Sequence, residues 1–490
     1  MTDRRVLMVA LDGLEISVLR RAMASGRLPN LKAYAEAATE LAVQSDGERL
    51  EGTVWPTFTT GTPPGYHGHH WFFQWVPEQG RFIDTADERF AVTPFWKAAT
   101  SVGKRVTVFD LPYTLPTGDA SERLLTGWGV QDEMAQHANP PSFKREIIKK
   151  HGRSKVEKDT LLVQTPEDRL KLARRMRAGA RQRARVLVDL AGRRDWDVML
   201  FAFGEYHLSG HHLSMPMQLS PKVDNEAALI GIVQPVDDAW PDIVKAAGDD
   251  CDIFLFALHG MQPKVAYAEA VQHVLEEMQG KPQAGPPKDD LLRRARNLMP
   301  ESVHRAIWLR LPASMRLQRM IQAWMARMDV ERDPVFVLEG DCAVALRVNV
   351  QGRDKYGVVP PSETRAMLDR VFAEVGRYTT PEGELPFVDM VVSSEVFPGP
   401  RSELLPDGML IYNPAVRALR EMTRDDGFKV ELVNPTSRNG IHTGKGFAFY
   451  RPGRSTTVKR DEIDNLDFAP TVLQMAGVEP GPDLHGDPFL

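Results

Sequence analysis

The stretch VLMVALDG (6–13) decides the fold, because six apolar residues are followed at once by Asp12 and Gly13. Two more stretches repeat this pattern, namely MLFAFGEYHLSGHH (199–212) and IFLFALHGM (253–261). Short continuous apolar runs are typical of strands that are buried on both faces of a parallel sheet. In open α/β sheets, ligands bind at the carboxyl ends of such strands. We therefore predict that the polar residues after these runs meet in one cleft.

Helical and strand patterns alternate along much of the chain. Apolar residues recur at helical spacing over 14–38, with a Gly-Arg-Leu-Pro break, and residues 95–112 predict a helix followed by a strand. A long helix is expected over 165–192, with Thr165 as its N-cap and Pro166 at its first position. This alternation predicts an α/β fold with a mainly parallel sheet.

The sequence pattern divides the chain into three expected parts. We predict a core formed by 1–281 and 433–490, an Arg-rich helical insertion or cap over 282–334, and a smaller α+β subdomain over 335–432. Within the insertion, residues 291–328 hold eight arginines among Leu, Ile, Met and Trp. Two interpretations stay open for these arginines: solvated faces of core-facing helices, or docking on an anionic substrate or membrane surface.

Composition indicates an ordinary globular protein of 490 residues, with 42% hydrophobic and 26% charged residues. The formal net charge of -5 argues against a nucleic-acid polymer as partner. Cys251 and Cys342 are too few for a disulfide scaffold or a multi-cysteine zinc site. No apolar stretch approaches the roughly 20 residues of a transmembrane helix. Because MTDRR runs directly into a strand, we expect a cytoplasmic protein.

Histidines follow several of the predicted strands. In GEYHLSGHH, His207 and His211 are four residues apart and can converge on one zinc ion if the segment is helical. His442 in a Gly-bounded loop is the candidate third imidazole, and His259 follows another strand. Three histidines with an open fourth position form a known type of catalytic zinc site. Asp12 is a further candidate metal ligand, since its carboxylate ends the first strand.

Hydroxyl groups gather in the stretch LEGTVWPTFTTG (50–61) and the residues after it. A metal ion beside a Thr hydroxyl can lower the pKa of that hydroxyl and make it a nucleophile. Composition alone does not choose among the threonines, which are Thr53, Thr57, Thr59, Thr60 and Thr62. The neighbouring His67, His69 and His70 are either further ligands or packing residues of a turn.

Taken together and in order, these motifs resemble the alkaline phosphatase superfamily, and within it the type I phosphodiesterase/nucleotide pyrophosphatase branch. The motifs that carry the likeness are ALDG, T-x-W-P-T-F-x-T-G-x-x-P-x-x-H-G, H-L-S-G-H, L-H-G, G-I-H and the closing DFAPTVLQMAGV…LHG. The resemblance covers essentially the whole chain. It implies an alkaline-phosphatase-like three-layer α/β/α sandwich and a two-metal hydrolase in which a Thr or Ser attacks phosphorus and forms a covalent intermediate.

The resemblance also implies roles for particular residues. Thr53 matches the nucleophile, and Asp12 matches the carboxylate that binds the metal beside it. His207 and His211 match the ligand pair of a D-x-x-G-H motif, His442 matches the last His of the second metal's set, and His259 matches the His of S-D-H-G. The implied metal set is Asp12, Thr53, His207, His211, His259 and His442, with Glu205 as an additional candidate.

The chain departs from the family pattern at the metal ligands. His207 stands where the family has Asp, and Leu258 stands where S-D-H-G has a ligand carboxylate. The spacing from Thr53 to Thr60-Gly61 is two residues shorter than in the family pattern. An ungapped match therefore puts Glu51 at the nucleophile position. Glu51 or Glu48 could instead supply a carboxylate to a metal ion. An imidazole-rich site favours zinc, or alternatively iron or manganese, over magnesium or calcium. Either one or two ions fit this pattern.

We therefore predict a metal-dependent hydrolase of small-molecule phosphoesters, with phosphoric diesters as the first substrate class. A sulfatase is disfavoured, because the stretch from Thr53 to Thr57 lacks the C/S-x-P-x-R motif of that branch. Phosphomonoesterase activity and a non-catalytic metal-binding homologue stay open, the latter because of Leu258.

Overall fold

The computed structural model describes residues 4–85, 90–129, 136–156, 163, 165–214, 224–263, 269–281, 303, 307, 310–326, 328–338, 340, 342–416, 419, 421–431 and 439–490. Two compact units contain them. The sheet unit lies within Met1–Phe72, Thr85–Lys264 and Ser437–Leu490, and the accessory unit within Phe73–Asp84 and Val265–Thr436. Much of the predicted insertion over 282–334 falls outside the described residues. The predicted division at 281, 334 and 432 therefore stays a prediction.

A nine-stranded sheet forms the centre of the sheet unit, in the order β20-β2-β19-β9-β1-β8-β5-β6-β7. Its central strands β9, β1, β8, β5 and β6 run parallel to one another, as predicted. β19 runs antiparallel to both β9 and β2, and β7 runs antiparallel to β6. The strands are β1 (Arg5–Leu11), β2 (Thr39–Gln44), β5 (Val106–Phe109), β6 (Glu122–Thr126), β7 (His137–Asn139), β8 (Val198–Phe203), β9 (Cys251–Ala257), β19 (Lys445–Arg451) and β20 (Glu462–Asp464).

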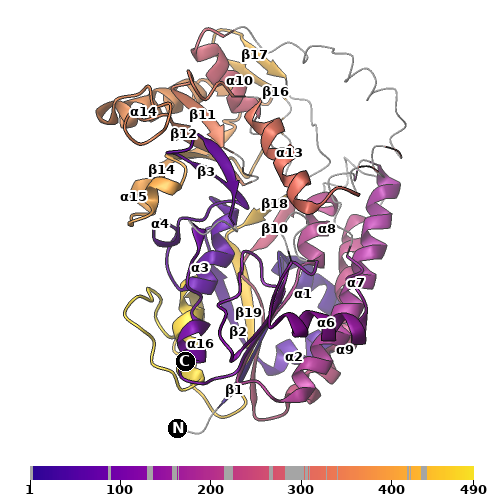
Figure 1. The fold of residues 1–490 in the computed structure, drawn as a ribbon. Coiled ribbons are helices and arrows are strands. Elements are labelled where there is room, and N and C mark those ends of the chain that lie inside the picture. Colours follow the sequence, from indigo (N-terminus) through magenta and orange to yellow (C-terminus); the bar gives the residue numbers. More distant parts are fainter. Residues whose placement is uncertain are drawn as a thin grey trace. The chain divides into compact units, whose positions relative to one another are not determined.

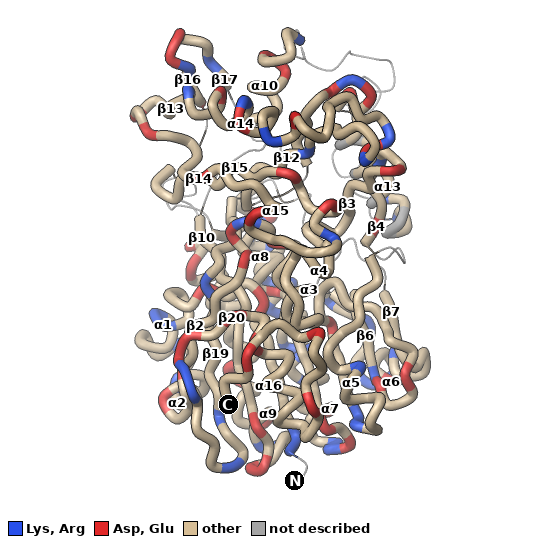
Figure 2. Tube along the Cα trace, turned by 90° about the vertical axis from the view of Figure 1, so that its left-hand side faces the viewer, with Lys and Arg blue, Asp and Glu red and all other residues tan. Residues whose placement is uncertain are grey.

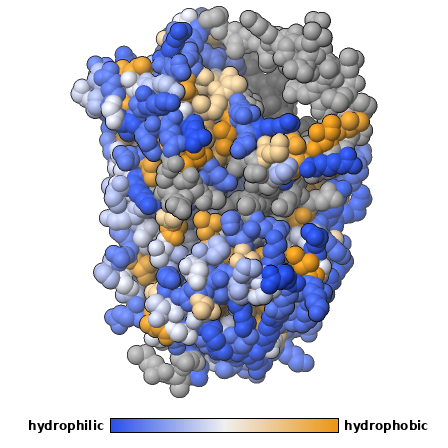
Figure 3. All heavy atoms as spheres, viewed as in Figure 1, coloured by the Kyte–Doolittle hydropathy of each residue, from blue (hydrophilic) through white to orange (hydrophobic). Residues whose placement is uncertain are grey.

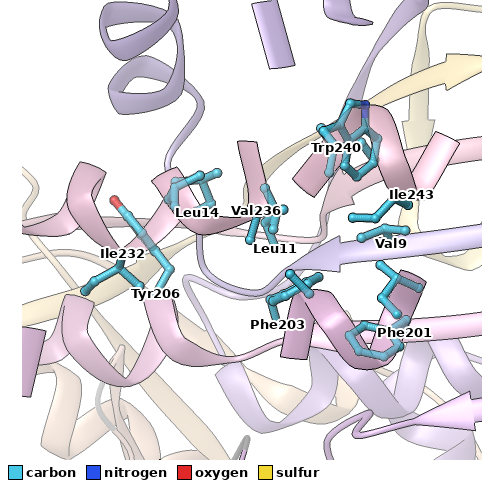
Figure 4. Close-up of a cluster of buried hydrophobic side chains, with 14 of the residues drawn as sticks. Val9, Leu11, Leu14, Phe201, Phe203, Tyr206, Ile232, Val236, Trp240 and Ile243 are labelled. Atoms are coloured by element: carbon cyan, nitrogen blue, oxygen red, sulfur yellow. The ribbon is translucent and has the colours of Figure 1, made fainter. Parts of the chain in front are cut away.

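Helices cover both faces of this sheet, so the unit has the predicted three-layer α/β/α architecture (Figure 1). On one face, Leu7, Val9 and Leu11 of β1 pack in an apolar cluster with side chains of the covering helices. These helices are α1 (Ile16–Ala24), α2 (Pro29–Ala37), α6 (Pro141–His151), α7 (Pro166–Arg193) and α9 (Asn225–Ala247). Figure 4 shows part of this cluster, in which Trp240 and Ile243 of α9 lie beside Val9.

The alternate residues of β1 face the second helical layer, because successive side chains of a strand point to opposite faces. Val6, Met8 and Ala10 pack in a separate apolar cluster with α3 (Val54–Thr60), α5 (Trp96–Ser101) and α16 (Phe468–Met475). Burial on both faces explains why these strands are continuous apolar runs.

The long helix α7 begins as predicted. The Thr165 hydroxyl accepts from the backbone N–H of Asp168, and the Asp168 carboxylate accepts from the backbone N–H of Thr165, so the two form a capping box. Pro166 occupies the first helical position, where its missing N–H costs nothing.

The accessory unit has its own apolar core and mainly antiparallel sheets. Its largest sheet has the order β11-β12-β15-β14, and one of the two smaller sheets has the order β13-β16-β17. Strand β14 ends at Val392, and Ser393–Val396 form the short helix α15 directly after it. The elements are β3 (Phe73–Val76), β4 (Arg81–Asp84), α10 (Glu269–Met278), α13 (Ala313–Met325), β11 (Val335–Leu338), β12 (Ala343–Val348), η4 (Pro361–Glu363), α14 (Thr364–Val375), β13 (Tyr378–Thr379), β14 (Phe387–Val392), η5 (Ser402–Leu404), β15 (Gly408–Tyr412), β16 (Glu421–Arg424) and β17 (Lys429–Glu431).

The described surface carries charges of both signs. Figure 2 shows acidic and basic residues interspersed along the chain. In Figure 3, hydrophobic residues are scattered among hydrophilic ones on the face in view. Among the described helices, none combines the length and apolar character needed to cross a membrane.

Candidate metal centre

The predicted ligands follow strands that end at the same edge of the sheet. β1 is parallel to β8, with Leu11 opposite Phe203, and it is also parallel to β9. Asp12 comes directly after β1, helix α8 (Glu205–Leu213) follows β8, and His259 lies two residues after β9. Parallel strands thus bring together side chains that are about 200 residues apart in sequence.

His442 reaches this edge from the C-terminal part of the chain. Because β19 is antiparallel to β9, its first residue lies at the edge where β9 ends. The short strand β18 (Gly440–Thr443) comes just before β19 and pairs with β10 (Gly260–Pro263), which places His442 opposite Met261. His442 is thereby held next to the segment that carries His259.

Three other imidazoles lie around His207. His207 and His211 lie one turn apart on α8, and their Nε2 atoms are 3.0 Å apart. The Nε2 atom of His442 is 3.2 Å from the Nε2 atom of His207. The ring of His259 lies 4.3 Å from that of His442, centroid to centroid. Of the four, His207 is the most exposed, with 12% of its side chain accessible, while the other three are buried.

The Asp12 carboxylate is buried and accepts from three neighbours. Its Oδ2 atom lies 2.6 Å from Nδ1 of His207, and its Oδ1 atom lies 3.0 Å from Nε1 of Trp55 and 3.3 Å from Nε2 of His259. Burial raises the pKa of the Asp12 carboxyl, but His207 and His259 outweigh burial and hold that pKa well below its usual range. Asp12 is therefore an anion at neutral pH.

The Nδ1 atoms of His211 and His442 also lie near oxygen atoms. Nδ1 of His211 lies 3.0 Å from the backbone carbonyl oxygen of Gly440, and Nδ1 of His442 lies 3.9 Å from Oε2 of Glu51. Burial, together with the surrounding imidazoles, lowers the pKa of His442 well below its usual value. A neutral imidazole keeps a lone pair, which is the form that binds a metal ion.

Two glycines make the close packing around α8 possible. Gly13 has φ +70°, and a Cβ atom there would lie 3.3 Å from Cα of His207. A Cβ atom on Gly440 would lie 2.3 Å from the backbone oxygen of Gly210, which is closer than real Cβ atoms come. Side chains at these positions would push the loops away from the helix that carries His207 and His211.

Thr53 ends the 3₁₀-helix η1 (Glu51–Thr53) and directly precedes α3. It is fully buried, and its hydroxyl donates to the backbone carbonyl of Leu50 at 2.6 Å. The same short helix begins with Glu51, whose carboxylate faces His442. The structure thus brings Asp12, the four histidines and the Glu51 carboxylate together, while the Thr53 hydroxyl bonds to its own turn.

Glu205 has a different partner. Its Oε1 atom accepts from Nε of Arg183 at 2.8 Å, and Nη1 of Arg183 donates to Asp110 at 2.5 Å. Arg183 is fully buried in α7, and its two carboxylates outweigh the effect of burial and raise its pKa, so it stays charged. This ion-paired triad holds the first residue of α8 against α7.

The remaining predicted residues lie in packed surroundings. Leu258 is buried in the apolar cluster that also contains Val54 and Trp55. Nε2 of His67 lies 3.0 Å from the Thr57 hydroxyl, and Nε2 of His69 lies 2.7 Å from the backbone oxygen of Phe90. His70 is buried as well.

The imidazole cluster fits a zinc ion. Two ligand atoms of a tetrahedral zinc site with bonds of 2.0–2.1 Å are about 3.3 Å apart. The separations of 3.0 and 3.2 Å from Nε2 of His207 to those of His211 and His442 are close to this value. A second set contains His259, since ring nitrogens of His207, His259 and His442 all lie within 4.8 Å of one another. His211 and His259 are therefore both candidates for the third ligand beside His207 and His442.

Sequence reasoning missed several supporting residues. Trp55 donates to Asp12, and Gly440 supplies a carbonyl to His211. We know of no sequence signal for either contact. Arg183 did carry a signal, because it lies three residues after Ala180 and four before Leu187 on the buried stripe of α7. A charge on such a stripe predicts a buried ion pair.

Comparison with solved structures supports the fold. Phosphonoacetate hydrolase from Sinorhizobium meliloti 1021, in complex with phosphonoformate, is similar over 97% of this chain and 96% of its own, with a TM-score of 0.53 and 15% sequence identity. An inactive variant of murine ectonucleotide pyrophosphatase/phosphodiesterase 5, in complex with AMP, is similar over 99% of this chain and 97% of its own, with a TM-score of 0.50 and 11% identity. No curated protein sequence matches the chain.

A family profile shows to which protein family the chain belongs. The profile described as type I phosphodiesterase/nucleotide pyrophosphatase matches residues 6–441, which include Asp12, the α8 histidines and His259. The resemblance inferred from the motifs is therefore confirmed, and the chain is a hydrolase that acts on ester bonds. It belongs to the type I phosphodiesterase/nucleotide pyrophosphatase family of the alkaline phosphatase superfamily.

Proposed function

We propose that this enzyme hydrolyses small-molecule phosphoesters, with phosphoric diesters as its main substrate class, and that it depends on a divalent metal ion. The single observation that carries the proposal is that the Nε2 atoms of His211 and His442 lie 3.0 and 3.2 Å from Nε2 of His207 at the carboxyl edge of the sheet. Family membership supplies the reaction class.

In this proposal His207, His211 and His442 would hold the ion, and His259 and Asp12 would lie beside it. When bound, a divalent ion supplies Lewis-acid stabilisation for the charge that develops on a phosphoryl group. The Asp12 carboxylate binds Nδ1 of His207 and fixes that ring, so the Nε2 lone pair of His207 faces the proposed metal position. Three imidazoles suit zinc, and iron or manganese are the alternatives.

Thr53 is the proposed nucleophile. Its Oγ1 atom would attack phosphorus and form a covalent phosphothreonine, while the P–O bond to the leaving group breaks and the departing alkoxide takes up the proton that the hydroxyl gives up. Water would then hydrolyse the phosphothreonine ester and release phosphate or a phosphomonoester. The backbone carbonyl of Leu50 orients the hydroxyl but cannot take its proton. This route therefore requires the hydroxyl to turn away from Leu50 when substrate binds.

A substrate panel tests the proposal. The zinc-loaded protein is assayed with bis-p-nitrophenyl phosphate, p-nitrophenyl phosphate, p-nitrophenyl sulfate, AMP esters and phosphonoacetate, the last because one fold neighbour is a phosphonoacetate hydrolase. We expect the diester to be hydrolysed fastest. Activity on the sulfate alone would favour the sulfatase alternative, and binding of metal without turnover of any compound would favour a non-catalytic homologue.

The role of Thr53 needs a matched pair of variants. Thr53→Ala should lower kcat by at least 10²-fold, whereas Thr53→Ser keeps a hydroxyl and should retain measurable turnover. Intact-mass analysis of the acid-quenched wild type should show the added phosphoryl group. Full activity in Thr53→Ala would contradict the role of Thr53 without contradicting phosphoester hydrolysis.

Two further expectations stay proposals. Small molecules rather than nucleic-acid polymers are the proposed partners, in line with the mixed charges in Figure 2. A cytoplasmic location also stays a prediction, to be tested by cell fractionation.

A further inference from the structure

We infer that the chain holds a single metal ion on His207, His211 and His442, and that Asp12 orients imidazoles instead of binding a second ion. The two-metal arrangement implied by the family requires carboxylates on the nucleophile side of the site. Asp12 and the residue at position 258 would have to supply them, and position 258 is Leu.

The hydrogen bonds of Asp12 argue against its being a ligand. A carboxylate has about four lone-pair sites for hydrogen bonds. Nδ1 of His207, Nε1 of Trp55 and Nε2 of His259 lie against three of them, at 2.6, 3.0 and 3.3 Å. Because the carboxylate is 1% exposed and three donors lie against it, about one lone-pair site, buried inside the protein, is left for a second ion.

The environment of Leu258 gives independent support. Leu258 is 1% exposed and belongs to the apolar cluster of Val54, Trp55 and Phe58. Where the family pattern has a ligand oxygen, this chain has a side chain that packs in the core. His259 lies beside Asp12, with its Nε2 atom 3.3 Å from Oδ1, but a site on these two residues would lack the carboxylate that the family pattern has at position 258.

The three remaining histidines have the arrangement of one complete site. The Nε2 atoms of His211 and His442 both lie close to Nε2 of His207, and the Nδ1 atoms of His207 and His211 lie 2.6 and 3.0 Å from Asp12 and the Gly440 carbonyl. Ligand histidines usually donate their second N–H to a carboxylate or backbone carbonyl, which fixes the tautomer and the ring orientation. Asp12 is therefore a positioning residue for His207, and the Gly440 carbonyl has the same role for His211.

Metal stoichiometry tests this inference, which rests on the proposed function only in requiring a bound metal. The full chain is stripped with a chelator, reloaded with zinc or with Co(II), and freed of excess ion by gel filtration. We expect one ion per chain by elemental analysis and by native mass spectrometry. The Co(II) form should show the intense visible absorption of a four-coordinate site.

Two variants separate an orienting role from a ligand role. Asp12→Asn keeps an oxygen acceptor and should still bind one ion, with zinc affinity lowered about 10- to 100-fold. His211→Ala is the ligand control and should lose affinity by a much larger factor. Circular dichroism of the metal-free proteins checks that both variants fold.

Two ions in the wild type and one in Asp12→Asn would overturn the inference, and so would a wild type that binds none. The proposed function fails separately, since a protein that binds one ion but turns over no phosphoester contradicts only that proposal. A protein that binds two ions and is active contradicts only the single-ion inference.

Discussion

The Oδ2 atom of Asp12 lies 2.6 Å from Nδ1 of His207, although 195 residues separate them in sequence. The contact joins the end of β1 to the first turn of α8 across neighbouring parallel strands. Nε2, the other ring nitrogen of His207, lies next to His211 and His442. By fixing Nδ1, the Asp12 carboxylate therefore sets the direction in which the Nε2 lone pair of His207 points. If the ion binds as proposed, Asp12 contributes to the metal centre by orienting a ligand and not by binding the ion itself.

Zinc should stabilise the protein measurably. A ligand that binds only the folded state adds about 2.7 kcal/mol at a free concentration of 100 times its Kd. We expect the unfolding midpoint of chelator-treated protein to rise on addition of zinc and to fall again with excess chelator. Magnesium should have little effect, because imidazole ligands suit it poorly. An equal response to magnesium would contradict the imidazole-based site.

Gly13→Ala should disturb both stability and metal binding. An L-residue at φ +70° costs about 1–2 kcal/mol, and the new Cβ would lie 3.3 Å from Cα and Cβ of His207. Gly103→Ala is the matched control, since Gly103 has φ +83° with no atom within 4 Å of a built Cβ. Urea unfolding and zinc titration should show the larger loss for Gly13→Ala. Equal effects in the two variants would mean that crowding of His207 is unimportant.

Arg183→Met should destabilise the protein strongly. It removes the guanidinium between Glu205 and Asp110 and leaves two buried carboxylates without their cation. Breaking a buried ion pair in this way costs about 3–5 kcal/mol. Arg174→Ala, on an exposed position of the same helix, should change the free energy of unfolding by no more than about 0.5 kcal/mol. Both values follow from urea titrations of the metal-free protein.

Asp189 should contribute to the pH dependence of stability away from the metal centre. Burial raises its pKa, but Lys150, Arg193 and His151 outweigh burial and hold that pKa below its usual range. A carboxyl whose pKa is lowered by folding stabilises the protein above its unfolded pKa of about 3.9, and this stabilisation is lost as the pH falls below that value.

Asp189→Asn should therefore lower the free energy of unfolding by about 1 kcal/mol at pH 6, given the small worth of partly exposed ion pairs. The difference from wild type should shrink as the pH falls from 5 to 3. Asp249→Asn, at an exposed position, is the control and should change the free energy of unfolding only slightly. A gap for Asp189→Asn that widens toward pH 3 would contradict the sign of the effect.

The fold and the ligand candidates could be predicted because they depend on local patterns. The apolar runs at 6–11, 199–203 and 253–258 identify buried parallel strands, and the topology of such sheets places Asp12, His207 and His259 at one edge. The spacing of His207 and His211 places both on one face of a helix. These inferences depend on the side-chain periods of a β-strand (two residues) and an α-helix (3.6 residues), which can be read directly from the sequence.

Only the tertiary structure decided how those residues are used. The indole of Trp55 and the imidazole of His259 lie against Asp12, Arg183 pairs with Glu205, and the Thr53 hydroxyl bonds to Leu50. Each contact depends on the direction of a side chain after helices and strands have packed together. Sequence spacing determines which residues share an edge or a face, whereas side-chain packing determines which of their atoms meet.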